Sequence, residues 1–449
     1  MRTPLLAMLA TLALGACAKD PAPAWHVANG ALRAPDGRAV ILRGANLGDQ
    51  KMAPYLDDKQ PADYQSLREV WGMNAIRFVM TWAAVEPSPG TYDDAYLDAV
   101  AERLQWASAS NLSVVLDMHE DVYGEGFGFD GAPRWACDEA RYAAFVPQDP
   151  WFLDTQDPNV MACVDDFYTT ADRQQHFVDA WHHVAERLAG EPAVIGFDVL
   201  NEPAWGTYAI FQFERDRLGP LYGSVVAAVR GAAPDWVAFL EPGGSRNVGI
   251  ATGFIAPFPF PNVMYSPHSY DASAESGNGF DPTHRAKILE SVGELAGEAQ
   301  ALNAGLWIGE YGGMTSTAGI TDYMTAQYDA AGMFAGGTMY WAFSKGDYGM
   351  IADDGSAKPV LLDVLVRPYP ELVAGDPISY AFDAASSTFA FSYAPDRGAV
   401  LPTELVVPDR VYPHGYRVAC GDCTFEMQPG RLVIDTPPSG DATITLAPQ

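Results

Sequence analysis

Eight short apolar runs, separated by longer stretches with helical periodicity, constrain the fold of this chain more than any other feature. The runs lie near Val40, Ala75, Leu112, Ala193, Asp235, Asn262, Gly305 and Gly337. Each is short, continuous and apolar, as expected for strands that are buried on both faces of a parallel sheet. Eight such strands with helices between them predict an α/β fold of the (β/α)8 TIM-barrel type.

The pattern changes around Arg367, where the helical stretches end. Segments such as "ISYAFD", "TFAFSYA" and "ATITLAP" alternate apolar and polar residues and are separated by turns. This alternation is typical of a small all-β sandwich. We therefore predict a barrel domain over residues 25–365 and a β-sandwich domain over residues 366–449.

The N-terminus, "MRTPLLAMLATLALGACAKD", predicts an exported protein. A positive residue precedes an apolar stretch from Leu5 to Leu14, which is too short to span a bilayer stably, so residues 1–16 read as a signal peptide. The segment "LGAC" resembles a bacterial lipoprotein box, which predicts lipidation of Cys17 and a tether over residues 17–24. The alternative is plain secretion after cleavage near Ala16. The protein is thus expected in the cell envelope or outside the cell.

The net charge disfavours some classes of binding partner, and the cysteines predict disulfides. The formal net charge of -30 disfavours nucleic acids and anionic membranes. Four cysteines remain besides Cys17, and in an exported protein they suggest two disulfides. Of the three possible pairings, sequence proximity favours Cys137–Cys163 and Cys420–Cys423. A single C-x-x-C without nearby histidines gives no reason to expect a metal.

Polar residues gather at the carboxyl ends of the predicted barrel strands, which is where barrels build active sites. Glu202 follows the fourth run and Glu310 ends the seventh. The others at this end are Arg77, Asp117, His119, Asp121, Asn201, His268, Tyr270 and Trp341. One such side chain alone would suggest a salt bridge or a capped loop. Their joint placement indicates a catalytic site.

Two carboxylates from different strands suit the hydrolysis of an acetal, because one can protonate the leaving oxygen while the other attacks the anomeric carbon. Their environments must push the two pKa values apart. Arg77 and Tyr270 would hold Glu310 ionised by charge and hydrogen bonding. The nearby anion would keep Glu202 protonated. Such a site needs no cofactor.

In order and strand by strand, these residues resemble the signature of glycoside hydrolase family 5, in clan A. The resemblance implies that Glu202 is the acid/base and Glu310 the nucleophile of a retaining mechanism. It also implies that Asn201 binds the sugar 2-hydroxyl, that His268 and Tyr270 orient the carboxylates, and that Trp341 stacks beneath the sugar.

The segment "DMHEDVYGEGFGFDGAPRWA" from Asp117 and the later "VRPYPELVAGDP" are similar to the endoglycoceramidase subfamily. That likeness implies cleavage between the glycan and the ceramide of glycosphingolipids. It adds Lys51 and Asp121 to the substrate-binding set of Arg77, His119, Asn201, His268, Tyr270 and Trp341. Glu120 departs from the pattern, since the subfamily usually has glutamine there. It would add a negative charge beside His119 or lie behind the site.

The segment "GFIAPFPFPN" could bring the enzyme to lipid. Phe254, Phe258 and Phe260 would either contact the membrane or pack under the barrel rim. Two other functions remain open at this stage. One is a different family 5 β-glycosidase, acting on a β-glucan, a steryl glycoside or glucosylceramide. The other is a surface lipoprotein that binds carbohydrate without catalysis.

Overall fold

The computed structural model describes residues 24–48, 52–56, 58–437 and 439–449. The signal peptide, Cys17 and Lys51 lie outside the described residues. Within the described ranges, no helix combines the length and apolar character that crossing a bilayer requires.

Eight parallel strands form a closed barrel in the order β10-β11-β4-β5-β6-β7-β8-β9. This confirms the predicted (β/α)8 barrel, and each strand falls within or beside one of the eight apolar runs. The strands are β4 (Arg43–Leu47), β5 (Ala75–Met80), β6 (Ser113–Met118), β7 (Val194–Asp198), β8 (Val237–Leu240), β9 (Val263–Tyr265), β10 (Gly305–Tyr311) and β11 (Gly337–Tyr340).

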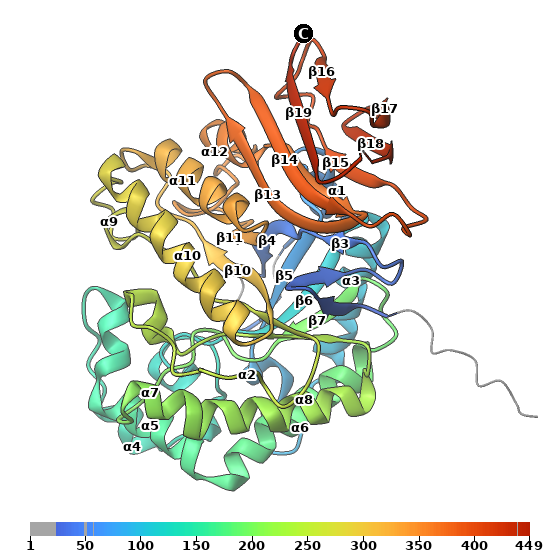
Figure 1. The fold of residues 1–449 in the computed structure, drawn as a ribbon. Helices are drawn as coiled ribbons and strands as arrows, with labels where there is room; N and C mark the ends of the chain where they lie inside the picture. The colour runs from blue at the N-terminus through green and yellow to red at the C-terminus, as the bar shows by residue number, and fades with distance from the viewer. Residues whose placement is uncertain (1–23, 49–51, 57, 438) are drawn as a thin grey trace, which may run out of the picture.

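Helices surround the barrel and form the layer outside its strands (Figure 1). They are α1 (Pro61–Glu69), α2 (Trp82–Val85), α3 (Asp94–Ala109), α4 (Glu139–Ala144), α5 (Pro158–Thr169), α6 (Ala171–Leu188), α7 (Ile210–Phe213), α8 (Gly219–Ala232), α9 (Ala272–Glu275), α10 (Arg285–Ala301), α11 (Ile320–Met333) and α12 (Pro359–Leu365). Short helical turns occur at η1 (Glu125–Phe127), η2 (Arg134–Ala136), η3 (Trp151–Gln156), η4 (Glu214–Leu218), η5 (Gly244–Val248) and η6 (Pro282–His284).

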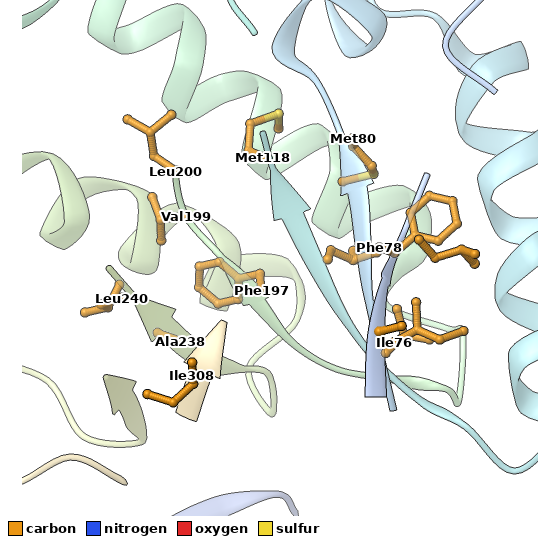
Figure 2. Close-up of a cluster of buried hydrophobic side chains, with 14 of the residues drawn as sticks. Ile76, Phe78, Met80, Met118, Phe197, Val199, Leu200, Ala238, Leu240 and Ile308 are labelled. Carbon is orange, nitrogen blue, oxygen red and sulfur yellow. The ribbon is translucent and has the colours of Figure 1, made fainter. Parts of the chain in front are cut away.

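Strand alternation explains how a charged residue enters an apolar run. Successive side chains of a strand point to opposite faces. On β5, Ile76, Phe78 and Met80 belong to the core between the barrel and its helices, and Figure 2 shows them along that strand. Arg77 therefore points into the barrel interior. Ala75, one position before Ile76, lies in the interior cluster with Trp307 at the amino end.

The C-terminal strands form two antiparallel sheets with a shared core, which confirms the predicted sandwich. The four-stranded sheet has the order β13-β14-β19-β16, and the seven-stranded sheet has the order β1-β2-β3-β12-β15-β18-β17. Their bounds are β1 (His26–Ala28), β2 (Ala31–Arg33), β3 (Ala39–Val40), β12 (Tyr369–Val373), β13 (Gly375–Asp383), β14 (Thr388–Pro395), β15 (Thr403–Val406), β16 (Tyr416–Ala419), β17 (Thr424–Gln428), β18 (Arg431–Thr436) and β19 (Ala442–Pro448).

The first three strands differ from the expected division of the chain, which assigned everything from residue 25 to the barrel. They extend the seven-stranded sheet instead, because Val40 pairs with Leu372 of β12. At the same time Trp25 and Val27 pack on the apolar cluster at the amino ends of the barrel strands. The N-terminal segment therefore closes the bottom of the barrel and joins it to the sandwich.

The sandwich packs on the barrel beside α11 and α12 (Figure 1). The buried guanidinium of Arg43 lies 4.8 Å from the ring centroid of Tyr328 and 5.4 Å from that of Tyr369. Glu371 of β12 pairs with Arg68 at 2.5 Å and with Arg431 at 2.8 Å. Such buried contacts make the sandwich a structural partner of the barrel.

Both predicted disulfides are present. Cys137 is bonded to Cys163, and Cys420 is bonded to Cys423. The first closes part of the long connection between β6 and α6, and the second lies in the sandwich.

Candidate active site

Arg77 is the centre of a buried polar network at the carboxyl ends of the strands. Its side chain is fully buried and donates to six side chains: Asp198 at 3.0 Å, Asn46 at 3.1 Å, Glu310 at 2.7 Å, Asp117 at 2.8 Å, Asn201 at 3.0 Å and Glu241 at 2.9 Å. A buried charge is tolerated only when it is paired in this way. Burial raises the pKa of Asp117 and of Asp198, and Arg77 opposes that effect.

Glu310 lies at the end of β10 with each carboxylate oxygen bonded. Arg77 donates to Oε1 at 2.7 Å, and the Tyr270 hydroxyl donates to Oε2 at 2.9 Å. Burial raises the pKa of Glu310, while the positive charges of His268 and Arg77 act in the opposite direction. The two donors favour the carboxylate form, which is the form a nucleophile needs.

Glu202 follows β7 in a left-handed backbone conformation, with φ of 41°. Its backbone N–H donates to Oε2 of Glu241 at 2.9 Å, which holds this uncommon conformation. Oε1 of Glu202 accepts a hydrogen bond from Nδ2 of Asn247 at 2.6 Å and lies 2.7 Å from Nδ1 of His268. Its side chain is 27% exposed, whereas that of Glu310 is 6% exposed. Glu202 is thus the more accessible of the two carboxyls.

The two carboxyls face each other. One oxygen of Glu202, one oxygen of Glu310 and a ring nitrogen of His268 all lie within 4.8 Å of one another. Retaining glycosidases place their two carboxyls about 5 Å apart, and inverting enzymes leave roughly 6.5 Å or more for a water molecule. The spacing therefore fits direct attack by one carboxylate.

His268 and Glu241 complete the charge balance between the two carboxyls. Nδ1 of His268 lies 3.6 Å from Glu310, and Nε2 lies 3.2 Å from Glu241. Burial lowers the pKa of His268, but Glu241, Glu310 and Glu202 outweigh it and raise the pKa well above its usual range. Glu241 directly follows β8, and the structure places its carboxylate in the site. Its position after a strand end is the signal in the sequence that could have identified it.

The other predicted residues lie around His119, beside the carboxyls. Nδ1 of His119 lies 2.8 Å from Asp117, and its ring is stacked on that of Trp341 with centroids 5.1 Å apart. Oδ2 of Asp121 lies 3.8 Å from Nε2 of His119. The amide of Asn201 donates to the backbone oxygen of Glu120 at 3.1 Å. Of the predicted substrate-binding set, Lys51 falls outside the described residues.

Glu120 connects two loops of the site rather than adding charge to it at neutral pH. Burial raises the pKa of Glu120 to about 8, opposed by hydrogen bonds from the backbone of Ala204 and Tyr123 and reinforced by Asp121 and Asp130. At neutral pH the side chain is therefore mostly protonated and close in shape and charge to glutamine. It borders an apolar cavity lined by side chains that include Trp82, Phe167 and Leu200.

The phenylalanines of the loop between β8 and β9 pack under the rim, as one of the two alternatives expected. Phe254 is 9% exposed, and its ring centroid lies 5.1 Å from that of Phe258, which in turn lies 5.7 Å from that of Phe260. The ring centroid of Tyr222 on α8 lies 6.2 Å from that of Phe254. Within the same loop Ile255 is 82% exposed. Phe254 therefore belongs to the core, and Phe258 and Phe260 are partly buried against it.

Two groups of side chains have spacings that a cation could use: His119 with Asp121 and Asp130, and Glu202 with His268 and Glu310. In the second group Arg77 and His268 already supply positive charge to the carboxylates. The acid/base chemistry that this spacing allows requires no metal.

Known protein families match both domains of this chain. Residues 34–347 match the model of the cellulase family, glycosyl hydrolase family 5, and residues 367–446 match the glycoside hydrolase family 5 C-terminal domain. Endoglycoceramidase I of Rhodococcus hoagii is 28% identical over 435 residues, covering 91% of this chain and 85% of that protein.

Solved structures of endo-glycoceramidase II from Rhodococcus sp. also match over 93% of this chain and 99% of theirs. Its complex with ganglioside GM3 superposes with a TM-score of 0.84 at 30% identity. Its lactosyl-enzyme intermediate superposes with a TM-score of 0.82 at 29% identity.

Proposed function

Because the chain belongs to glycoside hydrolase family 5, we propose that it is a retaining endo-β-glycosidase that separates the glycan of glycosphingolipids from ceramide. One observation carries the chemistry: the oxygens of Glu202 and Glu310 within 4.8 Å of each other at the mouth of the barrel. The similarity to endo-glycoceramidase II, which extends over both domains, supports the choice of substrate.

In the first step Glu310 attacks the anomeric carbon and forms a glycosyl ester. The bond from that carbon to the ceramide oxygen breaks with its electron pair, and the oxygen takes a proton from Glu202. In the second step Glu202, now a carboxylate, takes a proton from water. The resulting hydroxide displaces Glu310 from the anomeric carbon, which releases the glycan and restores both side chains.

The remaining residues of the site contribute to these two reaction steps by holding the reacting groups in place. Arg77 and Tyr270 occupy both oxygens of Glu310 and hold it for attack. Asn201 is fixed through both ends of its amide, which suits a contact with the sugar 2-hydroxyl. Trp341 and His119 present stacked rings at the sugar side, and aromatic faces commonly bind the apolar face of a sugar.

Export and anchoring are part of the same proposal. The lipoprotein box before Cys17 supports a lipid-anchored envelope protein, with plain secretion as the alternative. An anchored or exported enzyme would meet glycolipids outside the cytoplasm.

The test is a product analysis with glutamine variants. Purified wild-type protein is incubated with mixed gangliosides and neutral glycosphingolipids, with cellulose oligomers and with steryl glucoside, and the products are identified by mass spectrometry. Intact oligosaccharide and ceramide are expected. Glu310→Gln and Glu202→Gln should each lower the rate by at least about 100-fold, in line with the loss of a nucleophile or a general acid.

Glu102→Gln, on the exposed face of α3, is the matched control and should retain full activity. Cleavage of cellulose oligomers or steryl glucoside alone would redirect the proposal within the family. A variant of either catalytic glutamate with near wild-type turnover on the glycolipid would refute it.

A further inference from the structure

A small cavity lies behind the active site, between the loop after β6, the loop after β7 and α5. Its volume is about 30 Å³. Most of the residues around it are apolar, among them Trp82, Phe167 and Leu200, and its polar lining includes Glu120 and Tyr168. A cavity of this size has room for one water molecule, whose share of the volume of liquid water is about 30 Å³.

The hydroxyl of Tyr168 is a buried polar group that no protein group satisfies. Tyr168 is 3% exposed, and its hydroxyl has no hydrogen bond to any of the described residues. Its ring packs edge-on against Phe167 and Phe213, with centroids 5.0 and 4.9 Å apart, which holds the ring in place. Burying a hydroxyl without a hydrogen bond is costly, so such groups are nearly always paired with protein or with ordered water.

Glu120 supplies a second polar group at the same cavity. Its carboxyl accepts hydrogen bonds from the backbone N–H groups of Ala204 and Tyr123. Burial, and after it the carboxyl of Glu120, raise the pKa of Tyr168 well above its usual range, so the phenol remains a donor. A hydroxyl and a carboxyl therefore border one water-sized space without bonding each other. A water molecule both donates and accepts, so it can bridge the two.

We propose that this cavity binds one internal water molecule, which accepts a hydrogen bond from the Tyr168 hydroxyl and bonds the carboxyl of Glu120. The water joins α5 to the loop after β6. Glu120 extends the link to the loop after β7 through Ala204, which lies two residues beyond Glu202, and through the amide of Asn201 at 3.1 Å. Glu120 and Tyr168 are thus positioning residues for the proposed acid/base, and this part of the inference rests on the proposed function.

Structure and stability test the water site. A high-resolution crystal structure of the wild-type protein should show an ordered water about 2.7 to 3.0 Å from the Tyr168 hydroxyl oxygen and from an oxygen of Glu120. Tyr168→Phe removes a bonded hydroxyl, so the folding equilibrium constant, measured by denaturant unfolding, should fall about fivefold. Tyr412→Phe in the sandwich is the matched control. It loses a direct bond to the carbonyl of Ser387 at 2.9 Å and should show a similar fall with unchanged kinetics.

Two results would overturn the water site. One is a crystal structure in which the cavity is dry. The other is a Tyr168→Phe variant that is as stable as the wild-type protein or more stable, because removing a truly unpaired buried hydroxyl relieves a desolvation penalty instead of breaking a bond.

The positioning role is tested at Glu120 with two leaving groups. An alcohol such as ceramide leaves poorly and needs a proton, whereas 2,4-dinitrophenolate leaves without one. Glu120→Leu bonds neither the backbone N–H groups nor the water. It should lower kcat/KM 10- to 100-fold for a glycosphingolipid, part of the 10²- to 10⁴-fold that general acid catalysis supplies, and less than about threefold for a 2,4-dinitrophenyl β-glycoside. Glu120→Gln keeps an oxygen for the N–H groups and can bond the water, so it should restore most of the loss.

In folded variants, equal losses on both substrates, no loss in Glu120→Leu, or equal losses in the leucine and glutamine variants would overturn the positioning role and leave the proposed function standing. If Glu120→Leu does not fold, Tyr168→Phe decides: kcat/KM for the glycolipid should fall at least about threefold, and no fall would overturn the role. Wild-type protein that cleaves neither substrate would overturn the proposed function and the positioning role, while the crystal structure would still decide the water site.

Discussion

The charge on His268 depends on the carboxylates around it. Burial would favour the neutral ring, but Glu241 at 3.2 Å and Glu202 at 2.7 Å keep it protonated. Glu241 also binds Arg77 and the backbone of Glu202. A single carboxylate thus couples the charge of His268 to the conformation of the acid/base.

This coupling predicts a pH effect. The pKa of His268 is raised in the folded protein, so its charged form is present below that pKa and is lost as the pH rises through it. Glu241→Gln removes the first of the carboxylates that raise it, so the alkaline limb of kcat/KM should move to lower pH. The pH profile on a 2,4-dinitrophenyl β-glycoside and an NMR titration of His268 measure this shift. Glu102→Gln should not move it, and an unchanged limb in Glu241→Gln would contradict the coupling.

The sequence identifies some of these site residues and not others, and the difference has a physical reason. Glu202, Glu310 and most of their companions lie at strand ends, and Arg77 is a charged residue within the apolar run of β5, so the apolar runs themselves indicate where these residues lie. Asn247 lies beyond a strand end, in a short turn, and only the folded contact between η5 and the loop after β7 brings it to Glu202.

At the level of elements, the barrel strands were predictable because each is buried on both faces and forms a continuous apolar run. The membership of β1–β3 in the seven-stranded sheet was not, because β3 pairs with β12 more than 300 residues later. Local alternation reports that a strand exists and says nothing about its neighbour. The alternation of apolar and polar residues also did not indicate strand β17, because all five of its residues are exposed and the strand has no buried face.

The stability that the disulfide between Cys137 and Cys163 contributes can be predicted from the length of the segment it closes. This disulfide lies in the connection between β6 and α6 and joins cysteines with a sequence separation of 26. The sequence separation of Cys420 and Cys423 is only 3. The chain-entropy model gives about 3.5 kcal/mol for the long loop and about 2 kcal/mol for the short one. Replacing both cysteines of the first pair by alanine should therefore destabilise the protein more than the same change in the second pair. Denaturant unfolding under non-reducing conditions measures both, and the reverse order would contradict the expectation.

At the scale of the whole molecule, the described chain begins at the closed end of the barrel. Trp25 packs on the cluster at the amino ends of the strands, and the N–H of Val27 donates to Asn262, directly before β9, at 3.2 Å. Glu202 and Glu310 lie at the carboxyl ends of parallel strands. The start of the described chain and the catalytic mouth are therefore on opposite ends of the barrel.

If Cys17 carries the anchor, this arrangement decides which membrane the enzyme can use. Six residues lie between Cys17 and Ala24, and the seven Cα-to-Cα steps can span at most about 25 Å. A folded chain of this length has a radius of gyration of about 22 Å, so its diameter is roughly twice the reach of the tether. The mouth should face away from the anchoring membrane and act on glycolipids of a facing one.

Vesicles test this directly. Full-length lipidated protein is reconstituted with a fluorescent glycosphingolipid either in the same vesicles or in separate ones. We expect hydrolysis in separate vesicles to exceed that in the anchoring vesicles at least 10-fold. A flexible 40-residue insert after Ala24, with a root-mean-square length of about 35 Å, should raise hydrolysis in the anchoring vesicles, because it lets the domain turn over. Cys17→Ser, which cannot be lipidated, should cleave both equally. Full activity in the anchoring vesicles without the insert would mean that the closed end does not face the membrane.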